Sequence, residues 1–164
     1  MTKFGPTVKT KVLIDGNCVA EDVTISLPEV TFQTAEINAM GTINIPIALT
    51  DNIEAAIHQI GCDKGFYKAL GLKKTKFELR WVENKLKNSG DQEKFSCKAF
   101  ITGIASNIPG GDLSPGEAFD NSINVTVLRY NVFIDGKETV LIDKLNGICK
   151  LNGKDYAKEI NNLI

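Results

Sequence analysis

Apolar and polar residues alternate one by one along much of this chain of 164 residues. Between Ile43 and Leu49, for example, every second residue is isoleucine or leucine. A period of two is typical of a β-strand with one buried face, and it does not gather apolar residues on one side of a helix. Similar runs occur at 23–27, 77–81, 95–101 and 123–134. The sequence therefore predicts a mainly β protein. Pro46 cannot donate a ladder hydrogen bond, which predicts an edge strand or a bulge there.

The alternation changes phase within the run 123–134. Ile123, Val125 and Val127 lie on one face, whereas Leu128 and Tyr130 begin an apolar series on the other. Shifting a strand by one residue exchanges its two faces. Either a β-bulge near this point or a strand that is buried on both faces explains the change.

The last quarter of the chain contains three steps that are typical of tight turns: Asp135-Gly136, Asn146-Gly147 and Asn152-Gly153. Type I′ turns need positive φ at both central residues, which Gly and short Asx side chains tolerate best. We expect a hairpin around the first step and tight corners at the other two.

Two short helices are expected. Residues 66–70 lie between Asp63, a good N-cap, and Gly71, a good C-terminal stop. Residues 156–164 follow Asp155 and place apolar side chains at helical spacing. Helices this short need to pack on the sheets to persist.

The segment 52–60 is ambiguous from its residues alone. Ile53, Ile57 and Ile60 fit a helix, whereas Ile53, Ala55 and Ile57 fit a strand, and propensity slightly favours the helix. Two further segments, 28–41 and 106–119, have no clear period and are expected to be long loops. Loops of this length in a compact domain are usually functional or disordered.

The length of the chain fits one domain, which we expect to span residues 1–164. With a net charge of -1, the chain lacks the large positive charge of a protein dedicated to binding polyanions. The charges are unevenly placed, however. Residues 1–62 hold three lysines against seven acids, residues 63–98 ten basic residues against five acids, and residues 99–164 six against eight. This pattern fits solvated strand faces and a hairpin tip, or complementary patches between copies of the chain.

The basic middle also raises the question of nucleic-acid binding. Its cluster comprises Lys73, Lys74, Lys76, Arg80, Lys85 and Lys87. Single-strand platforms need exposed aromatic rings beside such residues. Here Phe77 and Trp81 alternate with the charged residues along the predicted strand and so lie on its opposite face, which predicts that the two rings face the core. A small β-barrel that binds nucleic acid or another ligand through the basic segment 64–98 is the alternative function.

The sequence offers little for catalysis. His58 is the single histidine, and Cys62, four residues later, is its one conceivable nucleophilic partner. The four cysteines Cys18, Cys62, Cys97 and Cys149 have no metal-ligand spacing, and no phosphate-binding or dinucleotide-binding motif occurs. We expect no enzyme, no cofactor and no metal. The chain lacks a signal-peptide core and an apolar run long enough to span a bilayer, so cytoplasmic synthesis with free thiols and no membrane binding is expected.

Taken together, the chain resembles the major tail tube proteins of contractile-tailed bacteriophages and the related R-type bacteriocins. The residues that carry the resemblance are 131–136, 140–147 and 151–155 with a closing helix, echoed by 12–16, 23–28 and 39–41. The resemblance implies two packed antiparallel sheets in a small barrel or sandwich, with one flanking and one C-terminal helix. It also implies that 52–60 is a strand.

The function that the resemblance implies is structural. Such subunits assemble as stacked hexameric rings, forming a conduit inside the sheath of a contractile particle. The implied partners are further copies of the chain, sheath protein, tape measure protein and baseplate or tube-initiator proteins, with DNA as transient cargo only in a phage. The implied location is the tail tube of a virion or bacteriocin particle.

The resemblance further implies that 28–41 is a loop that docks on the adjacent ring. Phe32, Ile37 and Met40 would be its apolar contacts. Pro28 and Gly41 would bound the loop.

Overall fold

The computed structural model describes residues 2–164, apart from the side chains of residues 59 and 60. The elements are β1 (Lys3–Ile14), β2 (Asn17–Glu21), β3 (Ile25–Ser26), β4 (Phe32–Ala39), β5 (Gly41–Thr50), β6 (Glu54–Ile60), α1 (Lys64–Tyr67), β7 (Thr75–Leu86), β8 (Gln92–Ala105), β9 (Asp120–Ile134), β10 (Lys137–Asp143), β11 (Ile148–Leu151), β12 (Lys154–Asp155) and α2 (Tyr156–Asn161). Strands hold 58% of the residues, in two antiparallel sheets accompanied by two short helices. The mainly β prediction is confirmed.

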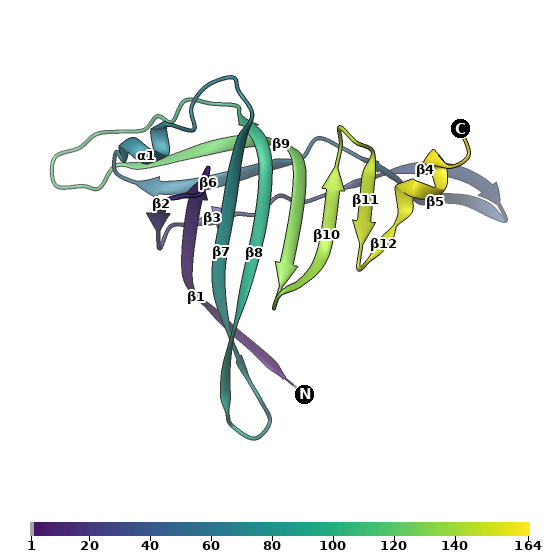
Figure 1. Ribbon diagram of the computed structural model, residues 1–164, viewed down its shortest axis with the longest axis horizontal. Coiled ribbons are helices and arrows are strands. Elements are labelled where there is room, and N and C mark those ends of the chain that lie inside the picture. Colours follow the sequence, from purple (N-terminus) through teal and green to yellow (C-terminus); the bar gives the residue numbers. More distant parts are fainter. Residues whose placement is uncertain (1) are drawn as a thin grey trace.

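The larger sheet has ten strands in an open path. Eight of them follow the order β12-β11-β10-β9-β8-β7-β1-β2, and β6 joins the sheet by pairing with β9 on one side and β3 on the other. Figure 1 shows the path from β1 to β12 across the molecule, with β3 and β6 behind it. Among the described strands no closed barrel forms.

Strand β9 is the branch point of this sheet. Its first half pairs with β6, from Ile60↔Asp120 to Glu54↔Thr126, and its second half pairs with β10. The change of partner coincides with a bulge, because β8 pairs Gly103 with Val127 but Thr102 with Arg129 and thereby skips Leu128. The predicted change of phase is therefore a bulge.

The bulge lets the sheet curl around one apolar core. Ile53 and Ile57 of β6 belong to the same buried cluster as Val12 of β1 and Leu79 of β7. Phe66 of α1 is fully buried in this cluster. Buried residues alternate with more exposed ones along the first half of β7 and along most of β8 and β9, and the phase in β9 changes at the bulge. Within residues 2–164, neither helix is long and apolar enough to cross a membrane.

Three Asx-Gly steps adopt the expected turn geometry. Asp135-Gly136 joins β9 to β10 with φ values of 51° and 77°, and Asn152-Gly153 joins β11 to β12 with 50° and 86°. Asp15-Gly16, between β1 and β2, has 49° and 85°. Asn146-Gly147 differs, since φ is positive only at Gly147. There the Asp143 carboxylate accepts hydrogen bonds from two backbone amides and shapes a wider turn.

Both helices form near the expected places but are shorter than predicted, and α1 begins at Lys64 instead of residue 66. Asp63 caps α1 by accepting a hydrogen bond from Gly65 at 2.8 Å, and the helix ends at Tyr67 instead of residue 70. Asp155 likewise caps α2, which ends at Asn161 instead of residue 164. The ambiguous segment 52–60 contains strand β6, as the resemblance implied.

Of the two expected long loops, 106–119 has no regular structure, whereas 28–41 contains strand β4. The loop prediction for 28–41 was thus wrong over Phe32–Ala39. β4 alternates Ala35, Ile37 and Ala39 with polar residues, and the small alanines make the period hard to recognise. Its partner β5 supplies the backbone hydrogen bonds. β5 pairs with β4 alone, so the expectation of an edge strand at Pro46 is confirmed.

Candidate assembly surfaces

Strands β4 and β5 form a two-stranded ribbon, here called the arm, which makes up the second sheet. In Figure 1 the arm lies behind the C-terminal elements, and its tip reaches the end of the molecule farthest from α1. Its register places Ile37 opposite Ile43 and Ala35 opposite Ile45 on one face. Ile37, Ile43 and Ile45 are 48%, 49% and 41% exposed. An isolated two-stranded hairpin is at best marginally stable, so this apolar face needs a partner.

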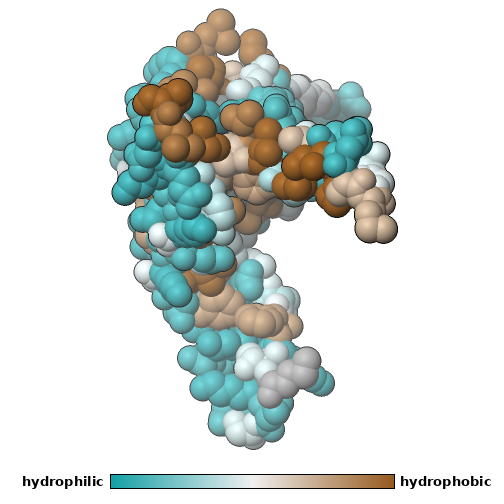
Figure 2. Space-filling model, turned by 90° about the vertical axis from the view of Figure 1, so that its right-hand side faces the viewer, coloured by the Kyte–Doolittle hydropathy of each residue, from teal (hydrophilic) through white to brown (hydrophobic). Residues whose placement is uncertain are grey.

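The tip of the arm carries Met40, whose side chain is fully exposed. Gly41 follows it with φ of 124°, a left-handed conformation that residues with a Cβ rarely adopt. Figure 2 looks at the molecule from the side of the arm tip, and hydrophobic residues gather in its upper half, where the arm and the C-terminal elements lie. Most of the lower half is hydrophilic.

The root of the arm is held firmly to the body. The Asp51 amide donates to the Thr31 carbonyl at 3.0 Å, which closes the two strands at their base. The Lys144 ammonium donates to the Asp51 carbonyl at 2.9 Å, and thereby ties this base to the turn after β10. We infer that the arm leaves the body in a defined direction.

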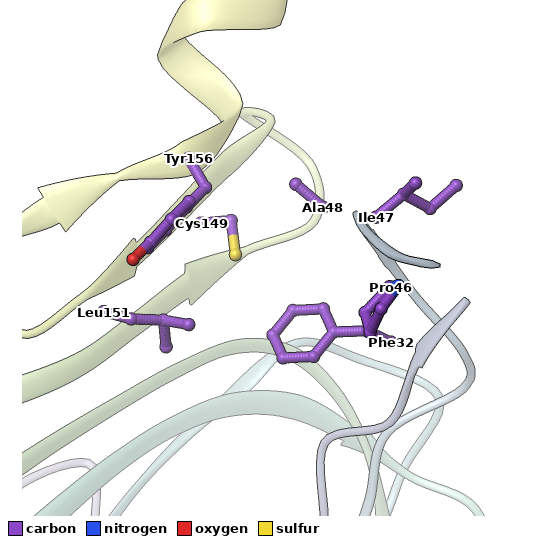
Figure 3. A pocket seen from close by; sticks show the side chains of 7 residues that line it. All are labelled: Phe32, Pro46, Ile47, Ala48, Cys149, Leu151 and Tyr156. Atoms are coloured by element: carbon purple, nitrogen blue, oxygen red, sulfur yellow. The ribbon is translucent and has the colours of Figure 1, made fainter. Parts of the chain in front are cut away.

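An apolar hollow lies beside this root. Its lining residues are Phe32, Pro46, Ile47, Ala48, Cys149, Leu151 and Tyr156, and its volume is about 160 Å³. Figure 3 shows the Phe32 ring pointing toward Leu151, with the Cys149 sulfur directed into the space between the arm and β11. Burial is the main cause that raises the pKa of the Cys149 thiol, which therefore stays protonated and unreactive at neutral pH.

The turn beneath the root is built around Asp143, which is buried. Burial alone would raise the pKa of this carboxyl. Hydrogen bonds from the Asn146 side chain and from the amides of Asn146 and Leu145, with the charge of Arg129, outweigh it and lower the pKa. Asp143 thus remains ionised at neutral pH and fixes the loop that carries Lys144.

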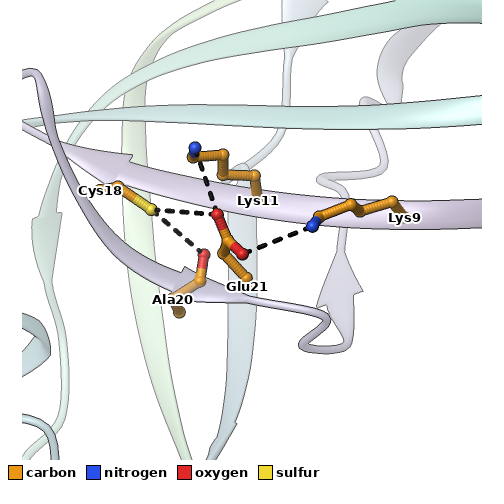
Figure 4. A network of polar contacts seen from close by, with 5 residues as sticks. All are labelled: Lys9, Lys11, Cys18, Ala20 and Glu21. Carbon is orange, nitrogen blue, oxygen red and sulfur yellow. Dashed lines mark hydrogen bonds and ion pairs between the residues drawn. The ribbon is translucent and has the colours of Figure 1, made fainter.

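At the other end of the sheet, β2 leaves an open edge that is surrounded by charge. Glu21 accepts from Lys9 at 3.4 Å and from Lys11 at 3.2 Å, with the Cys18 thiol 3.9 Å away (Figure 4). The hydrogen bond from Lys11 is the largest cause that lowers the pKa of Glu21. Glu21 is on β2 itself, whereas the two lysines are on β1, and a charged side chain on an edge strand discourages indiscriminate strand addition.

The basic segment 64–98 does not form a stacking platform from its own aromatic residues. Phe77 is buried, and Trp81 is half-buried with its indole N–H donating to Glu83 at 3.0 Å. The expectation that both rings turn away from the basic face is confirmed for Phe77 and holds in part for Trp81. Several cations are also paired: Lys85 and Lys87 both contact Glu93, and Arg80 contacts Glu78.

An aromatic pair that was not predicted from the sequence lies on the outer face of the large sheet. Phe100 and Phe133 pack edge to face with ring centroids 5.7 Å apart, next to Lys98. The sequence did contain a sign of this pair, because in the alternation of 95–101 Phe100 falls on the polar face, where an aromatic residue is unexpected.

His58 and Cys62 do not form a catalytic pair. The His58 Nε2 atom lies 3.4 Å from the Ser26 hydroxyl, on the neighbouring strand β3, and Cys62 is an exposed free thiol. Within the described residues, no group of three or more His, Cys, Asp or Glu side chains is arranged to hold a metal ion.

The predicted docking residues divide into two groups. Pro28 is buried in the segment before β4 and Phe32 is half-buried at the root, whereas Ile37, Met40 and Gly41 lie toward the tip. The prediction omitted β5, although Ile43 and Ile45 complete the apolar face with Ile37. Their alternation indicates a strand, but nothing in the sequence pairs that strand with 32–39.

An open sheet with a projecting apolar arm is the form of a subunit that assembles with other chains. The family model described as "Phage tail tube protein FII" matches residues 8–164. The chain therefore belongs to the phage tail tube protein FII family, and it is a structural protein of the virion tail, not an enzyme. No curated protein matched the chain significantly.

Proposed function

We propose that this chain is the inner tube subunit of a contractile injection particle and assembles into stacked hexameric rings inside the sheath. The observation that carries the proposal is the arm, an amphipathic ribbon whose apolar face is left in solvent by its own chain. Within the wall of a tail tube, the neighbours of each subunit would be further copies of the same chain, and we assign that face to them. Head-to-tail contacts that close a ring and also stack give a tube its symmetry.

Each arm would dock on the adjacent ring. Ile37 and Met40 act with Ile43 and Ile45 of β5, while Pro28 and Phe32 hold the root. The exposed apolar area of this face supports the assignment, since patches of this kind mark interaction sites. Contacts within a ring would use the open edges of the large sheet at β2 and β12.

The assembled tube would contact sheath protein on its outside, with tape measure and baseplate or tube-initiator proteins along the lumen and at the end. DNA would pass through as transient cargo if the particle is a phage. A DNA-free bacteriocin particle would use the same subunit without this cargo.

Electron microscopy of the purified protein tests the proposal. At high protein concentration, negatively stained samples should contain rings or tubes, because the apolar arm face favours association over exposure. A protein that stays monomeric at every concentration, with and without a tube-initiator protein, would refute self-assembly.

A further inference from the structure

The tip of the arm and the hollow at its root are complementary surfaces on the same chain. Met40 at the tip has a fully exposed, unbranched apolar side chain. The hollow is lined almost entirely by apolar groups and has a volume of about 160 Å³. A cavity of about 150 Å³ with an apolar lining accepts a benzene-sized group. The hollow therefore has room for one large side chain, and methionine adapts its shape to irregular gaps.

The arm cannot place its tip in its own root. Phe32–Ala39 is a paired strand of 8 residues, and strands rise roughly 3.3 Å per residue, so the tip lies on the order of 26 Å from the root. Any occupant from this chain must come from a second copy. Tip and root are different surfaces, so their contact either closes reciprocally between two copies or is heterologous and propagates from copy to copy, and a tube requires the second arrangement.

The charges around the two surfaces are also complementary. Residues 28–50 contain Glu29 and Glu36 but no lysine or arginine. At the rim of the hollow, the Lys154 ammonium lies 4.9 Å from the centroid of the Tyr156 ring and 4.0 Å from a Glu159 carboxylate oxygen, and a pair this long and exposed leaves the ammonium open to a second carboxylate. Glu36 is four residues from Met40 and is exposed, so an arriving tip brings a carboxylate toward the Lys154 ammonium.

We propose that Met40 of one subunit inserts into the hollow formed by Phe32, Leu151 and Tyr156 of a second copy, with Glu36 directed toward its Lys154. This inference rests on the proposed function and adds to it the surface that receives the arm. The tip-to-root contact links each subunit to one acceptor and makes it the acceptor of another.

Cysteine crosslinking tests the contact. The variant Asn38→Cys/Glu159→Cys leaves Met40 and the lining of the hollow intact, and it is made in a Cys18→Ser/Cys62→Ser background and treated with a short bismaleimide after assembly. We expect a ladder of covalent oligomers, because each tip lies at the rim of the next root. The matched control, Leu113→Cys/Glu159→Cys, places its first cysteine at another exposed position, in the loop 106–119, and should give no ladder.

A second variant keeps the test decisive if the cysteine protein does not assemble. Leu151→Trp fills the hollow and should lower the yield of tubes at least tenfold while circular dichroism stays unchanged. Tubes that form normally without a ladder, or that form normally with Leu151→Trp, overturn the tip-to-root contact and leave the proposed function intact. Wild-type protein that forms neither rings nor tubes, with and without a tube-initiator protein, overturns both.

Discussion

Shortening the arm is expected to abolish the stacking of this protein into tubes while the folded body survives. The change replaces residues 36–44 by Asn-Gly, which joins Ala35 to Ile45. These two residues already face each other across the ribbon, both carry the backbone N–H that the turn needs, and Asn-Gly favours a two-residue hairpin turn. The variant loses Ile37, Met40 and Ile43, so most of the face that we assign to the adjacent ring is gone. Sedimentation velocity should detect monomers or single rings only.

The matched control is Leu145→Ser, which removes an exposed apolar side chain from the turn 144–147. It should assemble like the wild type. Circular dichroism must show an intact β spectrum for the shortened protein, since Phe32, Ala48 and the rest of the root are retained. Tubes of normal length from the shortened protein would exclude the arm as the stacking element, and a collapsed spectrum would show that it belongs to the folding unit.

The second large effect concerns Gly103, in β8 beside the bulge. A Cβ atom there would lie 2.4 Å from the Thr126 carbonyl oxygen and 2.6 Å from a Val125 methyl group. The backbone carbonyl cannot move without disrupting the pairing of β8 with β9. Overpacking usually costs about 1–3 kcal/mol, and a clash with backbone belongs at the upper end, so Gly103→Ala should lower the free energy of unfolding by about 3 kcal/mol.

Urea denaturation of Gly103→Ala and Gly110→Ala measures this effect. Gly110 is in the loop 106–119 and serves as the control, because a Cβ atom added there would meet no other atom within 4 Å and its φ is not in the left-handed range. We expect the control to stay within about 0.5 kcal/mol of the wild type. Equal urea midpoints for the two variants would show that the Thr126 carbonyl of β9 does not lie as close to Gly103 of β8 as the structure places it.

The sequence predicted best where local chemistry decides the structure. The Asp-Gly step at 135–136 specifies a hairpin by itself, and the bulge at Leu128 was visible as a change of phase. The N-caps Asp63 and Asp155 also marked where both helices begin. The helix ends were misplaced, because a helix of one or two turns ends where its packing ends, which the sequence does not reveal.

The candidate site was predicted only in part. Met40 and Ile37 were identified through the resemblance, but the segment 28–41 was interpreted as a loop, because Ala35 and Ala39 weaken the alternation of β4. The hollow between Phe32 and Leu151 is formed by residues more than a hundred positions apart in the sequence. The apolar period of β4 or of β5 likewise does not indicate that these two strands pair. Such spatial proximity has no local signal in a single sequence.

A cryo-electron microscopy reconstruction of the assembled wild-type protein tests the central claim most directly. We predict hexameric rings in which the arm of every subunit lies against a subunit of the adjacent ring, with its apolar face covered. A closed two-fold dimer, or a tube whose arms project freely into solvent, would contradict it.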